Sequence, residues 1–60
     1  MTTIFTVWIF MSDGTLECQF EDFADAKKFA NAAEKIVDVK QVGVTNNESP
    51  EYLIVWTRPV

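Results

Sequence analysis

Few side chains in this chain could carry out acid–base, nucleophilic or metal chemistry. Its 60 residues include nine carboxylates, five Lys and Arg residues, one cysteine and no histidine, giving a formal net charge of -4. General acid–base catalysis usually needs histidine or two carboxylates in contrasting environments. Glu21, Asp22 and Asp25 are close in sequence, but they precede an alanine-rich run, where aspartates fit the N-cap and first turn of a helix. We therefore interpret this acidic group as helix capping, and it lacks the oxygen-ligand pattern of a calcium loop.

Cys18 is the one candidate nucleophile, and strand alternation points it into the core, where a thiol without a basic neighbour is inert. A lone cysteine cannot close an intrachain disulfide, and without histidine it cannot build a zinc site. The two glycines, Gly14 and Gly43, do not form a phosphate-binding loop. The sequence therefore predicts a protein that is not an enzyme and has no catalytic residue, cofactor or metal site.

An N-terminal hairpin is the first element that the pattern predicts. Residues 3–11 are rich in β-branched and aromatic side chains, and the pair Asp13-Gly14 is favoured in two-residue type I′ turns. A return strand over 15–20 would then place Ile9 opposite Cys18 and Val7 opposite Phe20. Alternation assigns one set of side chains to the core face: Phe5, Val7, Ile9, Met11, Leu16, Cys18 and Phe20.

A helix and two further strands complete the predicted order. The helix should run from Phe23 to Ile36 with a buried stripe of helical spacing, namely Ala26, Phe29, Ala30, Ala33 and Ile36. Residues 39–45 contain Lys40, Gln41 and Gly43, which favours an exposed edge strand. Residues 46–50 form a loop of turn formers. Residues 52–57 read as a nearly continuous apolar strand.

These elements predict one α+β domain over residues 1–60, with the order ββαββ. Because strands buried on both sides read as continuous apolar runs, we expect the first and last strands at the centre of a mixed sheet of order 2-1-4-3, with the helix packed on one face. This element order resembles the β-grasp architecture of ubiquitin-like and immunoglobulin-binding bacterial domains. The resemblance informs the fold and says little about function.

The sheet face that one helix leaves uncovered is the predicted site. Ile4, Trp8 and Phe10 alternate away from the core face. Tyr52, Ile54 and Trp56 would join them if Leu53 and Val55 point to the helix, which we favour over the opposite orientation. Large apolar patches mark interfaces, and Trp and Tyr are enriched in binding hot spots. The predicted protein-binding residues are Ile4, Trp8, Phe10, Tyr52 and Trp56.

Three interpretations of this face remain open: docking onto a larger protein, burial in a homodimer, or an intramolecular aromatic ladder. A domain of this size buries only about 60% of its unfolded surface, which favours a partner. Direct nucleic-acid binding is disfavoured because five scattered basic residues make no positive field. A lesser alternative is an acidic nucleic-acid mimic that uses Glu17, Glu21, Asp22 and Asp25.

Phe5 to Ile36, with its strand, hairpin, strand and alanine-containing helix, resembles the small phage-encoded RNA polymerase inhibitors of the T7 type. The resemblance implies a phage or mobile-element protein that binds and inhibits a host protein. We expect a cytoplasmic protein, because a leader pattern and an apolar run long enough to cross a bilayer are both missing from the sequence.

Overall fold

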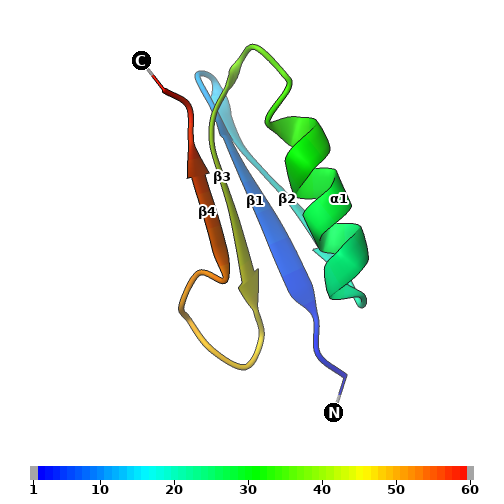
Figure 1. The fold of residues 1–60 in the computed structure, drawn as a ribbon. Helices are drawn as coiled ribbons and strands as arrows, with labels where there is room; N and C mark the ends of the chain where they lie inside the picture. The colour runs from blue at the N-terminus through cyan, green and yellow to red at the C-terminus, as the bar shows by residue number, and fades with distance from the viewer. Residues whose placement is uncertain (1, 60) are drawn as a thin grey trace.

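A four-stranded antiparallel sheet with one helix packed on it forms the fold (Figure 1). The computed structural model describes residues 2–59. The elements, in chain order, are β1 (Phe5–Met11), β2 (Gly14–Phe20), α1 (Phe23–Ala33), β3 (Val39–Asn46) and β4 (Ile54–Thr57). The strands lie in the order β2-β1-β3-β4. α1 contacts β1, β2 and β3, whereas β4 contacts only β3 among these elements.

The first hairpin confirms the predicted faces but not the predicted register. Val7 pairs with Cys18 and Ile9 with Leu16, so each partner is two residues from the predicted one. Met11 pairs with Gly14, which leaves Ser12-Asp13 as the loop. No non-glycine residue within 2–59 has a positive φ, so this loop is not the type I′ turn, which needs two such residues. A shift of two residues keeps every side chain on its predicted face, because side chains alternate with a period of two.

The helix begins where the sequence predicts and ends earlier. Asp22 is the N-cap, and its side chain accepts a hydrogen bond of 2.9 Å from the Ala24 backbone N–H. α1 ends at Ala33, and Ile36, placed by the sequence on the buried stripe, is 53% exposed. Ala26, Ala30 and Ala33 are buried, so the small side chains bring α1 close to the sheet.

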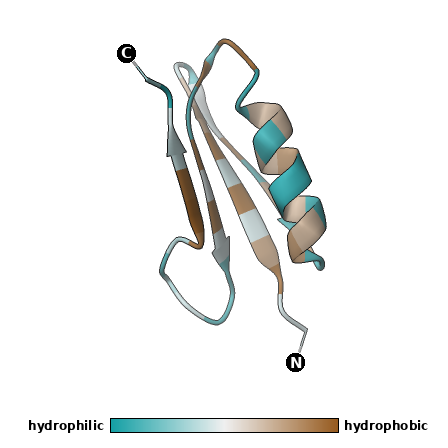
Figure 2. Cartoon of the chain, in the orientation of Figure 1, coloured by the Kyte–Doolittle hydropathy of each residue, from teal (hydrophilic) through white to brown (hydrophobic). Residues whose placement is uncertain are grey.

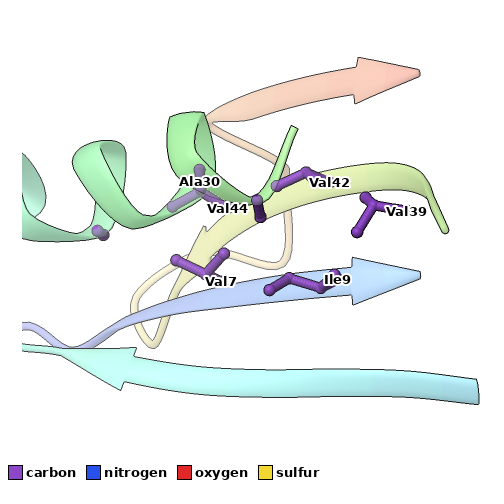
Figure 3. Packing of buried hydrophobic residues seen from close by; sticks show 8 residues of the cluster. Val7, Ile9, Ala30, Val39, Val42 and Val44 are labelled. Carbon is purple, nitrogen blue, oxygen red and sulfur yellow. The ribbon is translucent and has the colours of Figure 1, made fainter. Parts of the chain in front are cut away.

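The core lies between α1 and the β1–β3 pair (Figure 3). Val7 faces Val44 and Ile9 faces Val42 across this pair, and all four side chains are buried. The fully buried side chains of the core belong to β1, α1 and β3, while several larger ones pack around them, including Phe5, Phe20, Phe23 and Phe29. The rings of Phe5 and Phe23 lie 5.2 Å apart, and those of Phe20 and Phe29 lie 5.4 Å apart.

The predicted strand order 2-1-4-3 and the mixed sheet are wrong: the sheet is antiparallel, β3, predicted at an edge, lies beside β1, and β4, predicted at the centre, lies at the edge. The β-grasp arrangement is not confirmed. The expectation used continuous apolarity to identify central strands, which holds only for strands buried on both faces. Here one helix covers one face, so a central strand needs an apolar side chain only at the positions that face the helix. β3 meets this need with Val42 and Val44, which alternate with Gln41, Gly43 and Thr45. Val39, three residues before Val42, is also buried because the β1–β3 register shifts between Phe10 and Met11.

The alternation of side chains changes at Leu53, immediately before β4, and the sequence pattern does not show this change. Ile54 is the register partner of Val44, yet the preceding Leu53 N–H also donates to the Val44 carbonyl at 2.7 Å. Leu53, just outside β4, and Ile54 therefore both lie opposite Val44, which resembles the arrangement of a β-bulge. An extra residue at this point reverses the alternation for the residues that precede it.

Arg58 connects the C-terminal segment to the end of the helix. Its guanidinium donates to three backbone carbonyls, those of Glu34 (3.1 Å), Ile36 (2.6 Å) and Val39 (2.7 Å). These carbonyls belong to the C-cap of α1 and the connection into β3, where unpaired carbonyls and the negative end of the helix dipole favour a cation. Nothing in the sequence pattern around Arg58 indicates this role.

Candidate functional site

The sheet face opposite α1, termed the open face, carries a row of residues across all four strands that is apolar except for Glu17 at its β2 end. The register places Trp8 between Glu17 and Gly43, and Gly43 next to Val55. Directly opposed residues in antiparallel strands point to the same side. Since Val7, Val42 and Val44 face the helix, this row faces away from it. The row therefore forms the middle of a surface that α1 does not cover.

Tyr52 lies over Gly43 on this face. A Cβ atom added to Gly43 would come within 2.5 Å of Tyr52 Cε1 and 2.7 Å of Tyr52 Cδ1, so the ring occupies the space that any larger residue would need. Gly43 is buried in consequence, while Tyr52 itself is 51% exposed. The aromatic ring thus replaces the missing side chain of a strand glycine.

Trp8 is held in place from the neighbouring strand. Its indole Nε1–H donates a hydrogen bond of 2.9 Å to Thr45 Oγ1, and the side chain is half-buried. Because the indole nitrogen is satisfied, Trp8 presents an apolar surface in a fixed orientation. Trp8 and Tyr52 therefore contact other residues of the sheet and still expose apolar surface to solvent.

Phe10 and Ile4 occupy the margins of the open face. Phe10 lies in the next row, between Thr15 and Gln41, and is half-buried. Ile4 precedes β1 and alternates to the same side as Trp8. Two hydrogen bonds join its backbone to Asn47: the Asn47 N–H donates to the Ile4 carbonyl, and the Ile4 N–H donates to Asn47 Oδ1. The open face therefore contains four of the five predicted residues: Ile4, Trp8, Phe10 and Tyr52.

Trp56 does not belong to the open face, and the favoured orientation of the last strand is wrong for it. Trp56 pairs with Val42 and Ile54 with Val44, so both point to the helix side and pack against the core. The Arg58 guanidinium carbon lies 5.2 Å from the centre of the Trp56 ring, a cation–π distance. The bulge at Leu53 is the physical reason: it separates Tyr52 from Trp56, which simple alternation places on one face.

Val55 lies on the open face, although the favoured orientation of the last strand placed it on the helix side. It is 57% exposed and lies next to Gly43, beside the Tyr52 ring. Three of the six large apolar side chains exposed within residues 2–59 fall between positions 52 and 55: Tyr52, Leu53 and Val55. In Figure 2, β4 carries a strongly hydrophobic segment, whereas β1 alternates hydrophobic and pale bands. The uninterrupted apolar run from Tyr52 to Trp56 could have indicated that Val55 also contributes to the exposed apolar surface.

Across residues 2–59 no pocket is found, and no group of three or more His, Cys, Asp or Glu side chains could hold a metal ion. Asp22 is occupied as a helix cap, and Cys18 is half-buried beside Val7 on the helix side of the sheet. No helix in this part of the chain is long and apolar enough to cross a membrane.

Comparison with known proteins adds no assignment: no protein-family model matches the chain, and no curated protein or solved structure is significantly similar to it. The open face is therefore the feature from which a function is argued.

Proposed function

We propose that this protein is a small binding module without enzymatic activity, which docks its open face onto a larger protein. The observation that carries the proposal is the seating of Tyr52 over Gly43, beside Trp8 and Val55. These contacts fix the positions of apolar side chains on the side that α1 leaves uncovered, and Tyr52 and Val55 are exposed there. Such surfaces on small proteins are typical of protein interfaces.

The proposed partner is a host protein, and the proposed effect is inhibition by occupying a surface that the partner needs. The domain is small, and its binding residues are mounted on paired strands, so little conformational entropy is lost when it docks. Glu17 lies at one end of the apolar row, and Thr6, Gln41 and Thr45 lie on the same face. These polar side chains provide the rim that surrounds an apolar contact in typical interfaces.

Site-specific photocrosslinking in host cells tests this proposal. A photoreactive amino acid replaces Val55 in one variant and Leu16 in the control, because Leu16 is 53% exposed but lies on the helix side of β2. We expect a specific host-protein adduct from position 55 and none from position 16. The same adduct from both positions, or adducts from neither, would contradict docking through the open face.

An affinity measurement with the captured partner then assigns the contribution of individual side chains. Val55→Ser removes exposed apolar area from the open face, while Leu16→Ser removes a similar exposed side chain from the other side. We expect the first variant to weaken binding by about tenfold, since a buried aliphatic contact contributes about 1–2 kcal/mol. The second should bind like the wild type, and an equal loss in both would count against the proposal.

A further inference from the structure

The free edge of β4 is a second interaction surface, distinct from the open face. The Arg58 N–H donates to the Lys40 carbonyl at 2.9 Å, which makes Lys40 and Arg58 a hydrogen-bonded pair of the β3–β4 ladder. In an antiparallel ladder the backbone groups alternate between the two sides of a strand. The backbone groups of Ile54 and Trp56 therefore point to β3, and those of Val55 and Thr57 point away from the sheet.

The two edges of the sheet differ in charge. The segment from Leu53 to Thr57 has no charged side chain, so one of the usual protections against strand pairing is missing from this edge. β2, at the other edge, carries Glu17. All charged residues up to position 26 are acidic, and they lie on or next to β2 and at the start of α1: Asp13, Glu17, Glu21, Asp22 and Asp25.

We propose that β4 pairs with β4 of a second copy of this chain, antiparallel and about a two-fold axis. Pairing Val55 with Thr57 of the other copy, twice by symmetry, satisfies the N–H and carbonyl groups of both residues. Trp56 then lies directly opposite its symmetry mate. The pairing extends one continuous antiparallel sheet through both copies, with both helices on the same side.

The side chains fit this register. Paired residues must point to the same face, and Val55 and Thr57 both point to the open face, whereas Trp56 points to the helix side. α1 does not contact β4, so the helix side of β4 is free of helix cover (Figure 1). Two copies joined at β4 place their indoles against each other between the two helices, where opposed residues without direct hydrogen bonds approach most closely.

Charge favours a second copy at this edge over any pairing through β2. The chain carries a net charge of -4, so two copies repel each other most where their carboxylates meet. Pairing at β4 places the two acidic β2 edges at opposite ends of the joined sheet, at the largest separation that edge pairing allows. The contact is short, so we expect weak association with a dissociation constant of about 10–100 µM.

Two proline variants test the inference by sedimentation equilibrium. Thr57 and Thr15 lie at the two ends of one row across the sheet, on β4 and β2. The ladder pattern directs both of their N–H groups outward, so proline removes no hydrogen bond inside the monomer at either position. We expect wild type and Thr15→Pro to dimerise alike, and Thr57→Pro to weaken dimerisation by at least about tenfold.

Tyr52→Ala separates this edge dimer from a dimer that uses the open face, and it should leave dimerisation unchanged. A wild type that stays monomeric up to several hundred micromolar overturns the inference, as does equal weakening by both prolines. Loss of the dimer in Tyr52→Ala also overturns it.

If Thr57→Pro does not fold, two chemically synthesised chains give the same comparison. One carries an N-methyl group on the Val55 backbone nitrogen, and the control carries it on the Glu17 backbone nitrogen. Val55 also lies in the proposed β4 pair, so an adduct between two copies of the chain from position 55 would report this dimer, and only an adduct with a host protein would report docking of the open face.

Discussion

The contact between Gly43 and Tyr52 predicts that one substitution will have opposite effects in two backgrounds. A methyl group at position 43 would come within 2.7 Å of two Tyr52 ring atoms, so Gly43→Ala must displace the ring. Glycine inside a strand also destabilises the protein by about 0.5–1 kcal/mol relative to alanine, because it loses more backbone freedom on folding. The measured effect of Gly43→Ala is the sum of these two opposing contributions.

The magnitude follows from the exposure of Tyr52. Full burial of a large apolar side chain is worth about 1.5–3 kcal/mol, and Tyr52 is 51% exposed, so displacing its ring costs about 1 kcal/mol. In the wild-type background, Gly43→Ala should therefore change the free energy of unfolding by less than about 0.5 kcal/mol, with a net loss. In the Tyr52→Ala background nothing occupies the space, and the same substitution should stabilise by about 0.5–1 kcal/mol. The coupling energy is then about 1 kcal/mol.

Urea unfolding of the wild type, both single variants and the double variant, followed by tryptophan fluorescence, measures this coupling. Nuclear magnetic resonance supplies an independent check, since the Gly43 Hα signals should lie upfield in the wild type and lose that shift in Tyr52→Ala. If Gly43→Ala changes stability equally in both backgrounds, the ring is not seated on Gly43, and the geometry on which the open face depends is refuted.

Two further predictions concern the ends of the helix. Asp22→Ala should lower the free energy of unfolding by about 1 kcal/mol, because the Ala24 N–H loses its acceptor, and Asp22→Asn should recover most of it; equal losses in urea unfolding would contradict capping. Arg58→Ala should cost about 2 kcal/mol through the loss of three hydrogen bonds from a charged donor to backbone carbonyls. Arg58→Lys should restore only part of this, since an ammonium group cannot reproduce the planar guanidinium fork, and full recovery would show that charge alone matters.

Several features of the fold were predictable because they depend on neighbours in sequence. The alternation within residues 5–20 assigned both faces of the first hairpin, and it did so even though the register is shifted by two residues. Asp22 before an alanine-rich run predicted the helix start and its cap. Trp8 and Phe10 were correctly placed away from the core for the same reason, since the side-chain period of a strand is fixed by its backbone.

The errors arose where the answer depends on pairing between distant segments. The apolar content of the last strand suggested a central position, but the valines of β3 form the complementary surface to Val7 and Ile9. The predicted site was divided by a single extra residue opposite Val44, which leaves Tyr52 on the open face and turns Trp56 to the helix. Arg58 acquires its partners only when the C-terminal segment passes the end of α1.

The sequence by itself determined that this chain forms one helix and four strands, that it has few groups capable of catalysis, and that one aromatic-bearing side of β1 faces away from the core. Only the tertiary structure decided which strand lies beside β1, which face each half of the last apolar segment occupies, and which edge is left uncharged. Local spacing determines side-chain direction within an element. The order and register of strands are set by the burial and hydrogen bonding of residues far apart in sequence, and one extra residue can reverse the face to which side chains point.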